Sequence, residues 1–560
     1  MRNRSRSGRN SFLAAFFLAF ISTTFFSCAS GNRQVSAGSP SVSERPEAVE
    51  TKKGKIRGVY APSLKRGDPL VELYAGIPFA KPPVGDLRWK APQETEPWDG
   101  ILEADTFAPK AWQSELSGIE YFIYKNFIYH KADRQDKAPM SEDCLYLNIW
   151  RPENAGKDSK LPVLVYIHGG SLMSGSSYYE SYDGTTFAKN GIIMVTVAYR
   201  LGVFGYFASD ELAEESAEGT TGNYGLLDQI AALKWVHENI ESFGGDSENI
   251  TIAGESAGAS SVGALCTSPL SKGLFKRAIA ESSGLAVPVP PHTYRSLEDA
   301  KKMGRDIMAE FKVSSVEELR KIPAEKLIKT KYSNNSLTVD GYALTEDPYQ
   351  SYIKGRNHEQ ALLNGFNANE AYFFNFFGGS AKKKNYRSKI ESYFGSHTDD
   401  IIAARPASTN AQAKQNWNDI CSAVWFANSH NSWTKLISAQ GKPAYEYYFT
   451  KENRGIGTNH SGEMIYCYGN VPELKYYDES DHKLEEIMAS YWMNFIRTGN
   501  PNGSNYWTNE KLPEWPLASD MPGKVLELGA TVEPVPDPYA DLYPIIEATM
   551  LDKYNFNISY

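Results

Sequence analysis

The stretch Ile250–Gly258 reads Ile-Thr-Ile-Ala-Gly-Glu-Ser-Ala-Gly, and its order decides the fold. Ile250–Ala253 predicts a short strand that runs into a tight turn at Gly254, and the small residues after Gly258 predict the start of a helix. A G-x-S-x-G string alone occurs by chance. Between a strand and a helix, however, it is typical of a sharp turn that exposes the serine hydroxyl above a sheet. Ser256 is therefore the predicted nucleophile.

Strand and helix patterns alternate on both sides of this turn. Leu161–Ile167 and Gly191–Ala198 are nearly continuous apolar runs, which are typical of central strands covered on both faces, and Leu145–Trp150 alternates. Asn223–Glu241 places its apolar residues on one side of a helix. This alternation predicts an α/β fold with a largely parallel central sheet and helices on both faces.

Two later stretches, Tyr294–Lys331 and Lys382–Ile402, have helical patterns with polar faces and little strand signal. We expect them to be helical insertions on the sheet that form a cap over a cleft.

The composition is that of a large globular protein. The chain has 560 residues, of which 41% are hydrophobic and 22% charged, and its formal net charge is −9. These values exclude a disordered chain, a collagen-like repeat and a disulfide scaffold. The acidic balance argues against nucleic acid as a partner, because phosphate binding requires a basic face.

The first 27 residues predict a secretory signal. Four arginines lie in the first ten residues, and the apolar run Phe12–Phe26 that follows is shorter than the ~20 residues of a membrane-spanning helix. The sequence Phe-Phe-Ser-Cys at residues 25–28 resembles a bacterial lipoprotein cleavage box, in which Cys28 is lipidated. The alternative is plain secretion with cleavage nearby.

Residues 28–50 are rich in Ser, Gly and Pro and predict a flexible tether, which leaves residues 51–560 as one domain. No later apolar segment is long enough to span a bilayer, so the membrane is expected to be reached only through a lipid anchor at Cys28. Export would place the protein on the bacterial cell envelope or, without the anchor, in the periplasm or outside the cell.

Four further cysteines allow three disulfide pairings, and the sequence does not choose among them. They are Cys144, Cys266, Cys421 and Cys467. No C-x-x-C pair occurs, so a zinc site has no support, and we expect buried free thiols.

Several stretches together resemble the type-B carboxylesterase/lipase family, the α/β-hydrolases that include cholinesterases and bacterial para-nitrobenzyl esterases. The matching stretches are Tyr74–Pro83, Ser141–Trp150, Tyr199–Phe207, Gly222–Gly258 and Trp492–Asn502. The resemblance runs from about Gly54 to beyond Trp515. It implies an α/β-hydrolase fold and a serine hydrolase that needs no metal or organic cofactor.

An oxyanion hole is predicted at His168-Gly169-Gly170-Ser171, a glycine-rich loop after the strand Leu161–Ile167. Backbone without a Cβ can approach a substrate closely there, although a mere tight turn is the alternative. The resemblance assigns the oxyanion donors to the amides of Gly170, Ser171 and Ala257. Ser171 departs from the family's glycine, but its N–H can still donate. His168, beside the loop, is expected to have a structural hydrogen-bonding role.

The resemblance also assigns the acid and the base of a catalytic triad. Glu370 follows the short strand Ala361–Gly365 and matches the family's G-x-N-x-x-E pattern. Glu255 is the rival carboxylate, which we expect to lie buried beneath the site. Four histidines follow Glu370, namely His397, His430, His460 and His482. His460 matches the family's H-x-x-E pattern and is the predicted base.

These assignments predict a carboxylic-ester hydrolase that forms an acyl-enzyme on Ser256 and acts on small to medium aryl or alkyl esters. Two alternatives stay open, namely a catalytically silent adhesion module of the same fold and a lipase for long-chain esters. Because a neutral His460 is required, we expect the rate to fall below about pH 6.5.

Departures from the family limit the substrate prediction. Trp112 stands where the family has a cysteine that pairs with the equivalent of Cys144. No Trp lies between Gln113 and Cys144, where cholinesterases place a choline-binding tryptophan, so a choline ester is not the expected substrate. An aromatic cluster in that segment could line a pocket or be core; its members are Tyr121, Phe122, Tyr124, Phe127 and Tyr129. The natural substrate and the oligomeric state are not decided by the sequence.

Overall fold

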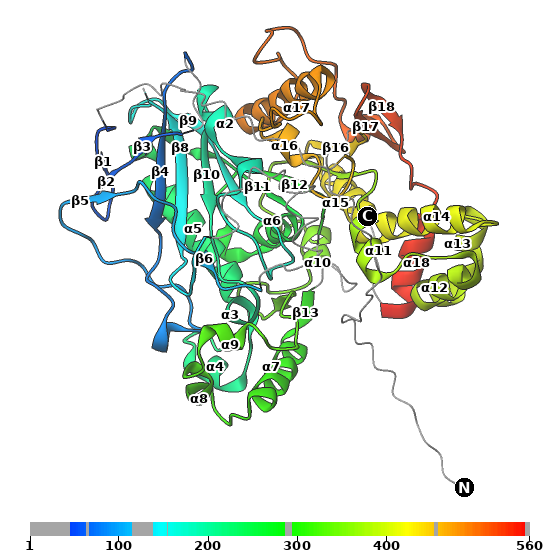
Figure 1. The fold of residues 1–560 in the computed structure, drawn as a ribbon, viewed down its shortest axis with the longest axis horizontal. Coiled ribbons are helices and arrows are strands. Elements are labelled where there is room, and N and C mark those ends of the chain that lie inside the picture. Colours follow the sequence, from blue (N-terminus) through cyan, green and yellow to red (C-terminus); the bar gives the residue numbers. More distant parts are fainter. Residues whose placement is uncertain are drawn as a thin grey trace, which may run out of the picture.

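A mixed β-sheet of eleven strands organises the part of the chain that the structure describes (Figure 1). The computed structural model describes residues 45–62, 67–114, 138–153, 155–285, 294–452 and 457–554. In spatial order the strands are β18 (Val532–Pro536), β17 (Lys524–Leu528), β16 (Ala444–Phe449), β15 (Ala361–Asn367), β12 (Arg277–Glu281), β11 (Gly245–Glu255), β9 (Leu161–Ile167), β10 (Ile193–Val197), β8 (Tyr146–Pro152), β4 (Val71–Pro78) and β3 (Val59–Tyr60).

The strands from β10 to β17 are parallel, and the strands at the two margins are antiparallel. In the centre, Val165 of β9 lies opposite Val195 of β10 and Ile252 of β11. The predicted α/β fold with a largely parallel sheet is confirmed. β11 begins earlier than predicted, at Gly245, and its pairing with β9 shifts register between Gly245 and Ile250.

Helices cover both faces of the sheet, as the continuous apolar strands predicted. On β9, Val163 and Val165 pack in one hydrophobic cluster with residues of α5 (Tyr224–Asn239) and α6 (Ala257–Thr267). The alternate residues Leu164 and Tyr166 pack in a second cluster, with residues of α2 (Thr185–Lys189), α16 (Met464–Cys467) and α17 (Glu479–Thr498). Successive strand residues point to opposite faces, so each face of β9 has its own core.

Helical lobes extend from the sheet where insertions were predicted. One comprises α7 (Leu297–Phe311), α8 (Val316–Arg320) and α9 (Ala324–Leu327), and the other α12 (Tyr386–Phe394), α13 (Thr398–Ala404) and α14 (Asn410–Ser422). Figure 1 shows them at the lower and the right-hand margin of the molecule. Tyr294–Ser296, predicted as helix, is instead a strand that pairs with Leu337–Val339.

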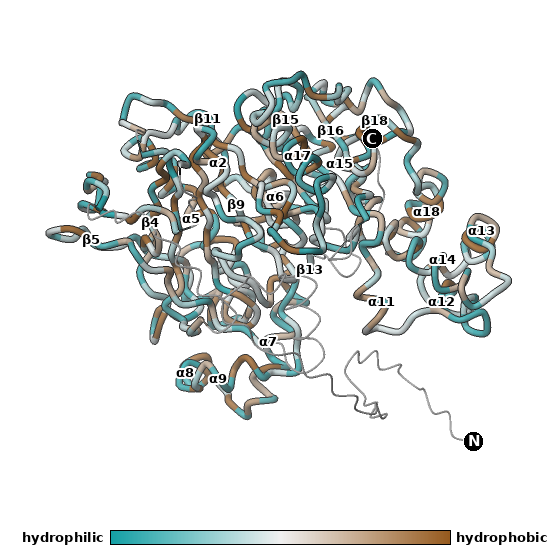
Figure 2. Tube along the Cα trace, turned by 45° about the horizontal axis from the view of Figure 1, so that its top comes forward, coloured by the Kyte–Doolittle hydropathy of each residue, from teal (hydrophilic) through white to brown (hydrophobic). Residues whose placement is uncertain are grey.

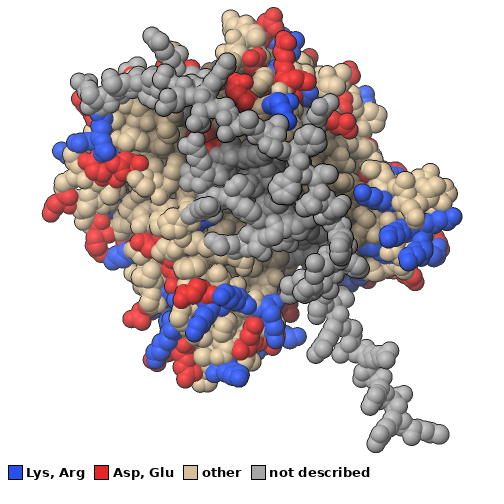
Figure 3. Space-filling model, viewed as in Figure 1, with Lys and Arg blue, Asp and Glu red and all other residues tan. Residues whose placement is uncertain are grey.

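Polarity follows this layout. Figure 2 shows apolar residues concentrated around the central strands, while peripheral segments such as α7 mix polar and apolar residues. Acidic and basic side chains are interspersed over the face seen in Figure 3, and Lys and Arg gather on its right-hand lobe.

The N-terminal boundary of the domain lies before residue 51. Val49–Glu50 forms a strand that pairs with Lys55–Arg57, and Arg45 makes ion pairs with Glu103 and Asp105. Residues 45–50, predicted as tether, are therefore part of the fold. The signal, Cys28 and the aromatic cluster at residues 121–129 lie outside the described residues and stay predictions.

Two further features concern the described residues. Cys144, Cys266, Cys421 and Cys467 are buried free thiols, in agreement with the sequence prediction. In these ranges, no helix combines the length and the apolar character needed to cross a bilayer.

Candidate active site

Ser256 occupies a strained turn between β11 and α6. Its backbone has φ +56° and ψ −125°, a conformation that costs a non-glycine residue about 1–3 kcal/mol and requires support from its surroundings. Neighbouring backbone supplies the support. The Ser256 N–H donates to the Glu281 carbonyl at 2.9 Å, and a Cβ on Gly258 would lie 2.1 Å from the Ile167 carbonyl oxygen. The flanking glycines are required because the backbone segments touch.

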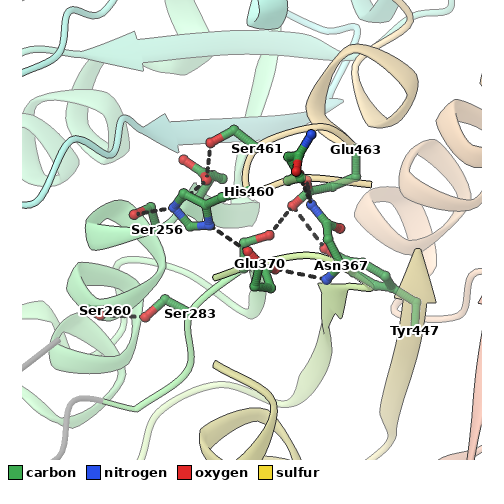
Figure 4. Close-up of polar contacts among 12 residues, drawn as sticks. Ser256, Ser260, Ser283, Asn367, Glu370, Tyr447, His460, Ser461 and Glu463 are labelled. Carbon is green, nitrogen blue, oxygen red and sulfur yellow. Dashed lines mark hydrogen bonds and ion pairs between the residues drawn. The ribbon is translucent and has the colours of Figure 1, made fainter. Parts of the chain in front are cut away.

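His460 lies between Ser256 and Glu370 (Figure 4). Its Nε2 is 2.9 Å from the Ser256 Oγ, and its Nδ1 is 2.6 Å from the Glu370 Oε2. Asn369 and Asn459 form an isolated parallel β-bridge, and the residues that follow them, Glu370 and His460, are thereby brought side by side. The structure therefore brings together the three residues that were predicted from segments at least 90 positions apart.

The other three histidines after Glu370 make contacts elsewhere. His430 is fully buried, with Nδ1 2.8 Å from the Asn364 Oδ1. His397 contacts Asp552 and His482 contacts Glu485. Over the described part of the chain, no group of three or more His, Cys, Asp or Glu side chains could hold a metal ion.

Buried carboxylates surround the imidazole. Glu255 Oε1 is 3.3 Å from the His460 Nε2 and accepts a hydrogen bond from Ser461 Oγ at 2.5 Å. Burial disfavours the charged imidazolium, but Glu255, followed by Glu370, outweighs burial and raises the pKa of His460 above its ordinary value of 6.5. Glu255 lies buried beside the catalytic candidates, as the sequence predicted.

Glu463 is the glutamate of the H-x-x-E pattern that begins at His460, and no role was predicted for it. Its carboxyl group accepts hydrogen bonds from Ser282 Oγ and from Asn367 Nδ2, while the Asn367 N–H donates to Glu370 at 2.8 Å (Figure 4). Burial, together with the charges of Glu370 and Glu255, raises the pKa of Glu463 to about 8. Glu463 therefore supports Glu370 through Asn367, and its burial disfavours a second negative charge next to Glu370.

The predicted oxyanion loop lies directly against the turn at Ser256. A Cβ on Gly169 would lie 3.0 Å from the Ser256 Cβ. Gly170 and Ser171 have φ values of +103° and +56°, and Ala257 begins α6. The first N–H groups of a helix have no intrahelical partner, so the amide of Ala257, next to Ser256, is available as a donor. The structure thus brings the two predicted donor segments together.

His168 stabilises this loop through a hydrogen bond and a stacking contact. Its Nδ1 is 2.8 Å from the Gly169 carbonyl oxygen, its ring stacks on Tyr199 at 4.5 Å, and the Tyr199 hydroxyl donates to its carbonyl. Burial lowers the pKa of His168 to about 4, so the ring is neutral at physiological pH. These contacts agree with the structural role expected for it.

Two aromatic rings that the sequence analysis missed flank His460. Phe374 of α11 (Tyr372–Gly378) has its ring centroid 5.3 Å from the imidazole, and Phe426 is at 4.9 Å. Phe426 belongs to a π-helical turn, Ala423–Ala427, a conformation frequent at functional sites. The only sequence signal for Phe374 was its position four residues after Glu370.

Replacement of Glu255 by glutamine is expected to shift the acidic limb of the pH–kcat/KM profile to lower pH. The substitution removes a negative charge that raises the pKa of His460, so the imidazole stays neutral further into the acidic range. The wild-type limb should lie above 6.5, higher than the sequence alone predicted. Profiles from pH 5 to 9 measure the shift.

The matched control is Glu248→Gln, an exposed carboxylate on the same strand as Glu255. It should leave the profile unchanged. A limb in Glu255→Gln that does not move, or that moves to higher pH, would contradict this electrostatic role.

Comparisons with known proteins agree with the fold and identify the family. The carboxylesterase family model matches residues 45–542. The chain is 35% identical to the fumonisin B1 esterase of Sphingopyxis macrogoltabida, over 81% of this chain and 82% of that protein. It is 32% identical to carboxylesterase 1C of Rattus norvegicus, over 87% and 90%. The crystal structure of the Geobacillus stearothermophilus carboxylesterase EST55 superimposes with a TM-score of 0.71 at 30% identity, covering 90% of this chain and 99% of that one.

Proposed function

The chain belongs to the carboxylesterase family and is a carboxylic-ester hydrolase, and from this premise we propose that Ser256, His460 and Glu370 are its catalytic triad. The observation that carries the proposal is the continuous hydrogen-bonded chain from the Ser256 hydroxyl through the imidazole to the Glu370 carboxylate. Family membership and esterase relatives argue against the silent adhesion module.

The proposed reaction has two halves. The Ser256 Oγ attacks the ester carbonyl carbon while His460 Nε2 takes its proton, and the resulting imidazolium then gives that proton to the departing alcohol. In the second half, water loses a proton to His460 and attacks the acyl-enzyme. The bond from the acyl carbon to Ser256 Oγ then breaks, the imidazolium returns its proton to that oxygen, and the carboxylic acid leaves. Glu370 keeps the proton of the neutral ring on Nδ1 and stabilises the imidazolium.

The amides of Gly170, Ser171 and Ala257 are the proposed oxyanion donors. Negative charge develops on the carbonyl oxygen during attack, and preset N–H groups stabilise it without reorganisation. The close contact of Gly169 with Ser256 supports this assignment, because it leaves no side chain between loop and nucleophile.

Small to medium aryl or alkyl esters are the proposed substrates. The ring of Phe374 is only partly buried and offers apolar surface beside the imidazole for an aryl or short alkyl group, while the fully buried ring of Phe426 packs on the imidazole from within the core. The relatives include an esterase named for fumonisin B1 and a medium-chain fatty acyl-CoA hydrolase of Anas platyrhynchos, so substrate range varies among them.

A chain-length series tests this substrate class. For p-nitrophenyl acetate, butyrate and palmitate, we expect kcat/KM to be at least about tenfold higher for the short esters than for palmitate, because the short acyl chains match the limited apolar surface at the site. A preference for palmitate would instead identify a long-chain lipase.

A further inference from the structure

The loop from His168 to Gly175 has an unusual backbone. Gly170, Ser171 and Leu172 follow one another with φ values of +103°, +56° and +57°. A positive φ is uncommon for any residue with a Cβ and is an outlier for a bulky one such as leucine. Such a conformation persists only when the surrounding structure imposes it. Contacts that hold this loop are therefore part of what places its amides.

Contacts within the loop and at its middle account for part of this restraint. The Gly170 carbonyl accepts hydrogen bonds from the N–H groups of Met173 and Ser174, both at 3.0 Å. The Leu172 carbonyl accepts one from the Gly202 N–H at 2.7 Å. These bonds close the turn, but they do not fix where its end at Gly175 lies.

The side chain of Gln113, 62 positions earlier in the chain, is hydrogen-bonded to Gly175 at the end of the loop. Its Nε2 donates to the Gly175 carbonyl at 2.8 Å, and the Gly175 N–H donates to its Oε1 at 2.9 Å. The second Nε2 hydrogen is directed to the Ala111 carbonyl at 3.0 Å. The side chain is more than nine-tenths buried, so its amide hydrogens and oxygen are committed to backbone partners.

Gly175 in turn lies on the base of the loop. Its φ is +119°, and a Cβ there would lie 2.3 Å from the His168 Nδ1 and 2.6 Å from the Gly169 carbonyl oxygen. Gly175 is thus in backbone contact with Gly169, the residue that precedes the proposed oxyanion donors. A displacement of Gly175 would therefore also displace Gly169 and Gly170.

We infer that Gln113 is a positioning residue for the oxyanion loop. Its paired hydrogen bonds hold Gly175 against Gly169, and this contact fixes the amides of Gly170 and Ser171 where the oxyanion develops. The inference rests on the proposed function of those amides. These amides stabilise the transition state, so loss of the hydrogen bonds from Gln113 to Gly175 should lower kcat more than it changes KM.

The test compares Gln113→Met with wild type. Methionine has a similar volume, but it leaves the Gly175 N–H and carbonyl without side-chain partners. We expect kcat for p-nitrophenyl butyrate to fall about 10–100-fold with KM changed less than about threefold, since loss of one complete oxyanion donor costs about 10²–10³ in kcat. The affinity for an aryl trifluoromethyl ketone, which forms a hemiketal oxyanion on a serine, should fall by a similar factor.

The matched control is Asn239→Leu. Asn239 is also buried, and its side-chain amide also bonds backbone groups on both sides. It donates to the Trp235 carbonyl at 2.8 Å and accepts from the Lys52 N–H at 3.1 Å, but it does not contact the oxyanion loop. A loss of stability without a loss of kcat or of ketone affinity is expected. A second variant, Gln113→Glu, keeps the acceptor for the Gly175 N–H and should give a kcat between those of wild type and Gln113→Met.

If Gln113→Met retains wild-type kcat and ketone affinity, or loses only as much as Asn239→Leu, the inference is overturned. If Gln113→Met does not fold, Gln113→Glu decides, and wild-type kcat together with wild-type ketone affinity in that variant overturns the inference. Failure of the proposed function looks different, because wild type itself would then not bind the ketone, whose hemiketal needs both the Ser256 hydroxyl and the oxyanion amides.

Discussion

Replacement of Ser256 by alanine is expected to lower kcat for p-nitrophenyl butyrate by about 10⁴–10⁶-fold. The substitution removes the only atom that forms the acyl-enzyme bond. What remains is binding and the oxyanion amides, which alone give limited catalysis. Steady-state rates measured on protein free of contaminating esterases, with circular dichroism to verify the fold, provide the test.

Ser260→Ala is the matched control. Ser260 lies one helical turn after Ser256 on α6, is equally buried, and its hydroxyl pairs with that of Ser283 at 2.8 Å (Figure 4). It has no contact with His460, so kcat should stay within about threefold of wild type, in line with an ordinary substitution that touches no reacting group. Equal losses in the two variants would show that the effect of Ser256→Ala is structural.

Replacement of Glu370 by glutamine is expected to lower kcat by about 10⁴-fold. The amide oxygen can still accept from the Asn367 N–H, but the NH₂ group then faces His460 Nδ1 and favours the tautomer with its proton on Nε2. A ring protonated on Nε2 cannot accept the Ser256 proton. Rates on the same ester measure the loss.

Glu359→Gln controls for the burial of a neutral amide. Glu359 is as fully buried as Glu370 and accepts a hydrogen bond from Tyr352, away from His460. It should retain kcat even if its stability falls. A Glu370→Gln enzyme with wild-type kcat would exclude Glu370 as the group that orients the imidazole.

The elbow at Ser256 was predictable because its signals are local. The strand, the glycines and the helix start adjoin one another in sequence, and the close backbone contacts at Gly254 and Gly258 require residues without a Cβ. Glu370 and His460 each had weak local signals, and only the family resemblance selected them. The structure explains their meeting through the bridge between Asn369 and Asn459, a contact that no local pattern encodes.

Residues whose role depends on tertiary packing were missed. Phe426 reaches His460 from a π-helical turn, and Glu463 reaches Glu370 through Asn367. Gln113 looked like an ordinary loop residue, because its partner Gly175 lies 62 positions away. The start of the domain was predicted too late in the chain for a similar reason. Arg45 forms ion pairs with Glu103 and Asp105, and only folding brings these residues close to it.

The most direct test of the triad is to label the protein with a fluorophosphonate and to locate the adduct by peptide mass spectrometry. The account predicts one adduct, on Ser256, and no adduct in the Ser256→Ala variant. It also predicts that the Ser260→Ala control is labelled as wild type is. An active enzyme that is not labelled, or that carries its adduct on another residue, would contradict the assignment of Ser256 as the nucleophile.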